Sequence, residues 1–177
     1  MRHPRAGDAD RDGRVPVWDA AVRLCHWVLA GLVVYNLVRD DGGWWHRTLG
    51  YVAVGVVLLR LTWSFFAPGA GGLAALKPSV RETLAYLRAG APRKTSHDPL
   101  GVWMVWLLWL LVLLLGVTGW MSRLDMFWGE DSVLAVHSWL ADALLVAVLV
   151  HLLGVLVMSF MWRENLPGTM LTGRKRR

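Results

Sequence analysis

Four histidines lie inside long apolar segments of the 177-residue sequence, at His26, His46, His137 and His151. Ionisable side chains are rare within a bilayer, and their presence there is by default a functional hypothesis. A single such histidine is more typical of a hydrogen-bonded core residue than of a ligand. Four histidines at related positions instead favour a ligand role.

The spacing of these histidines predicts two pairs. His137 and His151 are 14 residues apart on one expected helix, so they point to the same side, about 40° short of four turns and about 21 Å apart along the axis. His46 opens another apolar segment, whereas His26 lies near the opposite end of a third. Depth therefore pairs His46 with His137 towards the outer face and His26 with His151 towards the inner face.

Two facing imidazoles, present twice, are typical of haem iron held between helices by two histidines. Structural zinc requires four ligands, and no cysteine or carboxylate joins these histidines. A proton relay would more naturally use carboxylates, and only Asp142 lies near a predicted span. Cys25 is the only cysteine and no C-x-x-C-H is present, which excludes a disulfide, an iron–sulfur cluster within one chain and covalent haem c. The histidines thus predict two haem b groups.

Two glycines share a helix face with these histidines. Gly50 follows His46 by four residues and Gly154 follows His151 by three, so either could leave room for a flat macrocycle. Close packing between helices is the alternative role of such small residues. Four further glycines could serve in the same way: Gly31, Gly55, Gly116 and Gly119.

Two arginines also lie within the apolar segments. Arg60 follows His46 by 14 residues and is therefore expected to point inward at the level of the inner pair. A haem propionate is one partner for a buried guanidinium there. A long side chain reaching the membrane edge is the alternative. Arg23, three residues before His26, has the same two interpretations.

The composition explains which elements must position these residues. Hydrophobic residues make up 55% of the chain, charged residues 18%, and 12 residues are tryptophan. Mean hydropathy is +0.41. Crossing the hydrocarbon core takes about 20 apolar residues. Four segments meet or approach this length, at about 20–38, 45–66, 99–121 and 133–162. We therefore predict an all-α membrane protein, a bundle of four transmembrane helices that forms the haem-binding domain over residues 20–162.

Basic residues predict the orientation of the bundle. Five Lys or Arg lie in the N-terminal segment through Arg23, five in the connection between the second and third helices, and five after residue 162, against three in the other two connections. The positive-inside rule then places both termini in the cytoplasm. Residues 1–19 are expected to form a cytoplasmic tail with no signal peptide, and residues 163–177 a basic tail whose GRKRR end favours anionic lipid. The +6 net charge lies between apolar runs, so no nucleic-acid partner is predicted.

A short helix is expected in the connection between the second and third spans. Ser79 and Glu82 have the spacing of a capping box, and Val80, Leu84 and Leu87 share one face. This pattern predicts an interfacial helix on the cytoplasmic surface. A lip over a ligand site at the inner face is the alternative.

Motifs along the chain resemble the bacterial cytochrome b561 superfamily, most closely the di-haem cytochrome b subunit of nickel–iron hydrogenases. They are VPVWDAAVRLCHW, HRTLGY, RLTWSF, SHDPLGVWMV, GVTGW, FWG, AVHSW, HLLGVLVMS and RENLPGTMLTGRKRR, and they cover residues 15–177. The resemblance implies two b haems with axial ligands at His26, His46, His137 and His151. It also implies electron transfer between the quinone pool and a redox partner at the outer face, either a hydrogenase-type subunit or a c-type cytochrome. One branch of the superfamily instead oxidises superoxide to reduce quinone.

Two segments depart from the pattern of the superfamily. The loop after the second helix reads APGAGGLAAL, and the third helix is preceded by SHDP, with Asp98 in place of the usual asparagine. Asp98 followed by Pro99 predicts the start of a helix. His97 is either a solvated loop residue or a proton donor near an inner quinone site.

The leading function is therefore that of an electron-transfer subunit in the bacterial inner membrane rather than a stand-alone enzyme. Iron with six ligands has no open position for substrate. The connection between the third and fourth helices carries Arg123, Asp125, Glu130 and Asp131, a net charge of −2 that suits a basic redox partner. A haem-free anchor subunit would be colourless, and a metal-ion carrier would bind metal without haem absorption.

Overall fold

The computed structural model describes residues 14–39, 41–94, 98–127 and 130–176. His97 and most of the expected N-terminal tail lie outside these residues. Four long helices dominate the fold: α1 (Ala20–Val38), α2 (Trp44–Phe66), α4 (Pro99–Met121) and α5 (Asp131–Met161). All four are long and apolar enough to cross a membrane, which confirms the four predicted spans. α2 begins one residue earlier than expected and α5 two residues earlier.

Helix starts follow local capping signals. Asp19 accepts a hydrogen bond from the Val22 amide (2.8 Å) at the start of α1, and Asp98 accepts one from the Gly101 amide (2.8 Å) at the start of α4. The connection between α2 and α4 contains short 3₁₀ turns at Gly69–Gly71 and Leu73–Leu76, followed by α3 (Val80–Arg88). Ser79 caps α3 by accepting from the Glu82 amide. The predicted short helix is therefore present.

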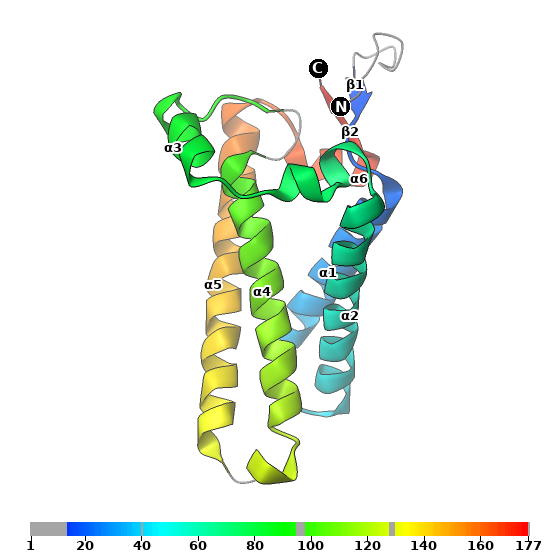
Figure 1. Cartoon of the computed structure of the whole chain (residues 1–177), viewed down its shortest axis with the longest axis vertical. Coiled ribbons are helices and arrows are strands. Elements are labelled where there is room, and N and C mark those ends of the chain that lie inside the picture. The colour runs from blue at the N-terminus through cyan, green and yellow to red at the C-terminus, as the bar shows by residue number, and fades with distance from the viewer. Residues whose placement is uncertain (1–13, 40, 95–97, 128–129, 177) are drawn as a thin grey trace.

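The two ends of the bundle differ in what covers them (Figure 1). One end, here called the terminal end, carries α3, the short helix α6 (Leu166–Thr172) and the paired strands β1 (Arg14–Pro16) and β2 (Arg174–Arg176). The other end, here called the hairpin end, carries the connections α1–α2 and α4–α5, the second of which includes a 3₁₀ turn at Asp125–Phe127. The chain therefore forms two antiparallel helix pairs with both strands at the same end.

The interior lies where α2, α4 and α5 meet the connection between α2 and α4. α4 packs against α5, α1 packs against α2, and α2 also contacts α4. Val57 of α2 is fully buried and Leu76 is 1% exposed, and both belong to a core that includes Trp109 and Leu144. The outside of the bundle is apolar as well, with Phe160 87% and Trp139 77% exposed. Such a surface suits lipid rather than water.

The C-terminal segment, expected as a basic tail, is folded. β2 pairs antiparallel with β1, and Lys175 is only 4% exposed, with its ammonium 5.7 Å from the centre of the Trp162 ring. Glu164 forms an ion pair with Arg93 (3.0 Å) and accepts from the Arg176 amide (2.9 Å). Lys175 therefore does not present its charge to a lipid surface. We call Arg93, Glu164, Lys175 and Arg176 the terminal cluster.

Electrostatics within the terminal cluster follow from this packing. Burial raises the pKa of Glu164, but the hydrogen bonds from Arg93 and the Arg176 amide outweigh it, so the pKa lies below its usual range. Burial lowers the pKa of Lys175, and the carboxylate of Glu164 partly opposes that shift. The cluster is thus a compact charged network that joins Arg93, in the connection before α4, to the segment that follows α5.

Candidate haem-binding sites

The structure brings the four apolar-segment histidines together as two cross-helix pairs. His46 of α2 and His137 of α5 have ring centroids 6.3 Å apart, with an angle of 66° between the ring planes. His26 of α1 and His151 of α5 have centroids 6.5 Å apart, with an angle of 57°. These are the two pairings that depth and helix phase predict, one at the hairpin end and one nearer the terminal end.

The ring separations can be compared with those needed for a shared metal ion. Metal–imidazole bonds are about 2.0–2.1 Å long and the nitrogen lies about 1.1 Å from the ring centroid, so one ion between two imidazoles separates the centroids by about 6.3 Å. The observed 6.3 and 6.5 Å agree with this value. Within the described residues, no group of three His, Cys, Asp or Glu could hold a metal ion. Each pair therefore suits an iron whose other ligands come from a macrocycle.

Hydrogen bonds fix the tautomers of the hairpin-end pair. Nδ1 of His46 lies 2.7 Å from the Arg39 carbonyl oxygen, which can only accept, so this nitrogen carries the hydrogen. Nδ1 of His137 lies 2.8 Å from Oγ1 of Thr118, which itself donates to the Leu114 carbonyl (3.0 Å). His137 therefore also donates from Nδ1. Both rings keep an unprotonated Nε2, the atom that a metal would bind.

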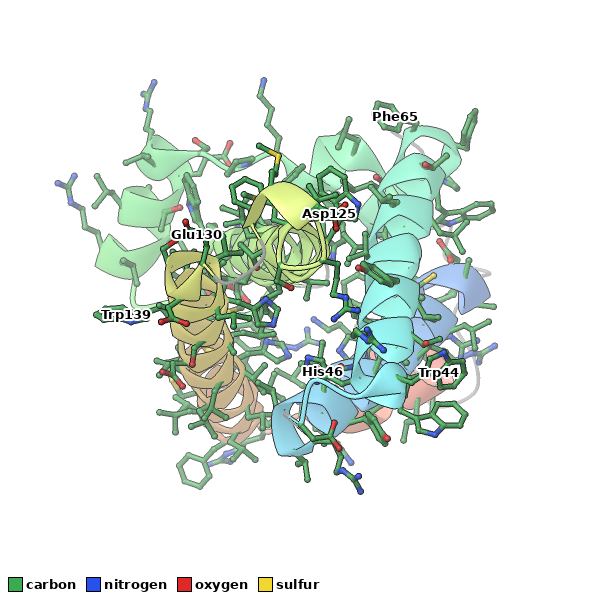
Figure 2. All side chains as sticks on the ribbon, turned by 90° about the horizontal axis from the view of Figure 1, so that it is seen from below. Trp44, His46, Phe65, Asp125, Glu130 and Trp139 are labelled. Atoms are coloured by element: carbon green, nitrogen blue, oxygen red, sulfur yellow. The ribbon has the colours of Figure 1, made fainter. Side chains whose placement is uncertain are left out.

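A cavity of about 560 Å³ adjoins the hairpin-end pair. That volume is typical of a small-molecule or cofactor site. Both histidines line it, and so do Gly50, Gly119 and Asn36. In Figure 2, which views the hairpin end, His46 lies towards the central space between the helices, whereas Trp44 and Trp139 lie towards the outside. The pair therefore lines a cavity between the helices, whereas the two tryptophans face outward.

The glycines at this level have different roles. A Cβ on Gly119 would lie 3.4 Å from Cε1 of His137, and one on Gly50 would lie 3.8 Å from Oδ1 of Asn36, both at the cavity. A Cβ on Gly116 would lie only 2.4 Å from Cγ2 of Val54, so Gly116 allows α2 and α4 to approach closely. Gly154 has no atom within 4 Å of such a Cβ. Gly50, Gly116 and Gly119 all line the cavity, and Gly116 in addition allows close packing of α4 against Val54 of α2.

Asn36 is a polar side chain at the cavity that sequence reasoning missed. Its Nδ2 donates to the Leu32 carbonyl (2.9 Å), and its Oδ1 is buried with no hydrogen-bond partner among the described residues. An unpaired buried acceptor is costly unless a ligand or water supplies a donor. A lone asparagine in an apolar helix was the available signal, but nothing in the sequence indicates which way it points.

The terminal-end pair has different surroundings. Neither His26 nor His151 has a hydrogen bond to a described residue, and Nδ1 of His26 is buried without a partner there. The ring of Trp27 stands edge-on to His26 with centroids 5.1 Å apart. Van der Waals packing, rather than hydrogen bonding, therefore orients this pair within the described part of the chain.

The two candidate arginines lie near this end but have different contacts. Arg60 is 6% exposed, its Nη2 donates to the Gly71 carbonyl (3.0 Å), and its guanidinium lies 5.7 Å from the centre of the Trp109 ring. Its Nη1 is buried and has no partner among the described residues. Arg60 is therefore buried beneath the connection between α2 and α4. Arg23 instead donates to the Leu171 carbonyl at the end of α6.

The fold and the histidine pairs define a class of four-helix membrane proteins with paired imidazoles between helices. The sequence model of the prokaryotic cytochrome b561 family matches residues 17–173, and the chain therefore belongs to this family. Comparison with curated proteins gives no significant match. Family membership establishes a multi-pass bacterial membrane protein, a b-type cytochrome that binds haem b and transfers electrons across the membrane.

Proposed function

We propose that this chain is a di-haem cytochrome of the bacterial inner membrane that connects a redox partner at the outer face with the quinone pool. The observation that carries this proposal is the presence of two cross-helix histidine pairs, with centroids 6.3 and 6.5 Å apart, on the same helix α5. Each pair has the separation that a shared iron requires. One pair alone would support only a mono-haem protein.

In this proposal, His46 and His137 hold one haem and His26 and His151 hold the other. Each haem, when bound, supplies a one-electron iron couple with no open coordination position. The protein would contribute two imidazole nitrogens to each haem and hold the rings in position. Because His137 and His151 are 14 residues apart on α5, the two sites lie at different depths, about 21 Å apart along the helix axis. That arrangement provides two stations between the faces of the membrane.

Cationic groups at both sites suit haem propionates, and at the terminal end the cationic group, Arg60, is buried. Arg47 and Arg123 line the hairpin-end cavity together with the unpaired Oδ1 of Asn36. At the other end, Arg60 has an unpartnered Nη1 and lies 14 residues after His46 on α2, at the depth of the terminal-end pair. A charge-assisted hydrogen bond to a carboxylate would satisfy such a guanidinium. We therefore assign Arg60 to the terminal-end site, and Arg47 and Arg123 to the hairpin-end site.

Basic residues support a cytoplasmic terminal end and an outer hairpin end. The residue ranges 1–19 and 163–177 then lie in the cytoplasm. α3 exposes Val80, Leu84 and Leu87, a surface that suits the membrane interface. At the hairpin end Asp125, Glu130 and Asp131 are exposed, where a basic partner could dock. Quinone would exchange electrons near the cytoplasmic side.

Haem content tests the proposal most directly. The full chain would be purified in mild detergent from haem-replete cells, and haem b per chain would be measured together with reduced-minus-oxidised spectra. We expect two low-spin b haems per chain. One haem would show that one histidine pair is not a site. A colourless protein would contradict the proposal and favour a haem-free anchor subunit.

A further inference from the structure

Thr118 of α4 is a buried polar residue that contacts one of the proposed ligands. It is 9% exposed, and its Oγ1 lies 2.8 Å from Nδ1 of His137 across the α4–α5 interface. The same oxygen lies 3.0 Å from the Leu114 carbonyl and 3.2 Å from the Leu115 carbonyl. Thr118 is therefore part of a hydrogen-bonded chain from the backbone of α4 to the imidazole.

The two carbonyl contacts of Thr118 favour one direction for each hydrogen bond in this chain. A hydroxyl has one hydrogen to donate and two lone pairs to accept with, and the carbonyls of α4 can only accept. The hydroxyl hydrogen of Thr118 therefore points to the backbone of its own helix, and its lone pair accepts from Nδ1–H of His137. This arrangement holds His137 in one tautomer and limits rotation of its ring.

We propose that Thr118 is a positioning residue that orients His137 and lowers the reduction potential of the hairpin-end haem, an inference that rests on the proposed function. An acceptor on the remote nitrogen makes the ligating nitrogen a stronger electron donor. A stronger donor stabilises ferric iron more than ferrous iron. Thr118 therefore shifts the hairpin-end couple towards the oxidised state.

Thr118 is the residue through which this effect can be tested by substitution. The other hairpin-end ligand, His46, donates to the backbone carbonyl of Arg39, which no side-chain change removes. Neither terminal-end histidine has a comparable acceptor among the described residues. Replacing Thr118 should therefore change one haem and leave the other unaffected.

The experiment compares three variants of the full chain with the unchanged protein. T118V removes the hydroxyl and keeps the branched shape, whereas T118S keeps the hydroxyl. T62V is a matched control, because Thr62 also donates to the carbonyl four residues earlier (Leu58, 2.9 Å) but contacts no histidine. Haem content is measured first, followed by potentiometric titration and low-temperature electron paramagnetic resonance. H137A, which is expected to keep only the terminal-end haem, assigns the two potentials.

We expect T118V to raise the reduction potential of the hairpin-end haem by up to about 59 mV, which is a tenfold change in the one-electron equilibrium constant. The electron paramagnetic resonance signal of that haem alone should also change. T118S should restore both values and T62V should change neither. Loss of the hairpin-end haem in T118V but not in T118S would also support positioning.

Three results would overturn the inference. An unchanged or lowered hairpin-end potential in a T118V protein with both haems would leave Thr118 a packing residue. Loss of the same haem in T118S would show that shape, and not the hydroxyl, matters. Fewer than two haems in the unchanged protein would refute the proposed function itself, and this outcome is distinguished from the others because it is measured before any substitution.

Discussion

The two histidine pairs have nearly equal ring separations, 6.3 Å at the hairpin end and 6.5 Å nearer the terminal end, but unequal surroundings. At the hairpin end each ring donates from Nδ1 to a fixed oxygen, of Arg39 in one case and Thr118 in the other. At the terminal end the rings have no hydrogen bond to a described residue. The comparison teaches that helix packing alone can bring two rings to this separation, and that hydrogen bonds to the rings are an additional restraint present only at the hairpin end of the described structure.

The terminal end is stabilised at a different level of structure. Instead of bonds to the histidines, it has the β1–β2 pair and the terminal cluster, in which Glu164 joins Arg93 to the backbone of Arg176. Arg23 adds a bond from α1 to the Leu171 carbonyl. One end therefore fixes its candidate ligands directly, and the other fixes the helices that carry them.

The largest expected effect comes from two single substitutions, each of which removes one histidine of one pair. His137→Ala and His151→Ala lie on the same helix, yet each should lower haem content from two per chain to one, because both axial ligands of a site are required. The spectrum of each variant gives the properties of the remaining site. A single substitution that removed both haems, or neither, would break the assignment of two independent sites.

Filling the cavity should affect the hairpin-end site alone. A Cβ on Gly119 lies 3.4 Å from Cε1 of His137, so the further methyl groups of Gly119→Val should displace the ring and remove that haem. Gly55→Val is the matched control, since no atom lies within 4 Å of a Cβ there. Haem content per chain and the spectrum of the remaining haem measure the effect. Equal haem loss in both variants would indicate a general helix defect.

Replacing the buried Arg60 should affect the terminal-end site and leave the hairpin-end site unchanged. Arg60→Gln removes a positive charge near the terminal-end pair. Loss of this charge stabilises ferric over ferrous iron, so the reduction potential of the terminal-end haem should fall by up to about 59 mV, a tenfold change in a one-electron equilibrium. Arg60→Lys keeps the charge and should stay closer to the unchanged protein. Potentiometric titration measures both haems together. A shift of the hairpin-end haem alone would contradict the assignment of Arg60.

The smallest effect is expected from acid. The pKa of Glu164 is lowered in the folded protein, so its stabilising contribution is present above the ordinary value of 4.5 and is lost as pH falls through the lower folded value. Lowering the pH from 7 to below 4.5 should therefore decrease Tm progressively, as measured by thermal unfolding in detergent. Glu164→Gln should remove this dependence.

The same acid treatment can sharpen the comparison between the two ends. His137→Ala retains the terminal-end site and His151→Ala retains the hairpin-end site. As the pH falls, His137→Ala should release its haem at a higher pH than His151→Ala, because the terminal cluster supports the terminal end. Haem release at the same pH in both variants would show that the terminal cluster does not stabilise haem binding at the terminal end.

The four spans and the histidine pairs were predictable because both depend on local regularity. Apolar length gives the helices. The 14-residue spacing of His137 and His151 gives a common face that backbone geometry preserves. The capping signals at Ser79 and Asp98 are equally local, and the structure confirms both. These features require no knowledge of how one helix is rotated against another.

The remaining features depend on contacts between segments distant in sequence. Thr118 meets His137 only because α4 packs on α5 in one register, and no periodicity within either helix reveals that register. The C-terminal segment was expected as a lipid-binding tail because its charge is local information. Its fold depends on Glu164 meeting Arg93, 71 residues earlier in the chain, and on β1 lying beside β2.

The strand pair has a consequence for the order of events during synthesis. Val15 lies opposite Lys175, and the amides of Val17 and Trp18 both donate to the Gly173 carbonyl. These bonds join the two ends of the described chain, so the first strand must wait without a partner until every span has left the ribosome. Closing so long a loop is slow relative to forming a local helical hairpin. β1 can therefore pair with β2 only after α6, the last helix, has been synthesised. The first described residues are accordingly expected to fold last.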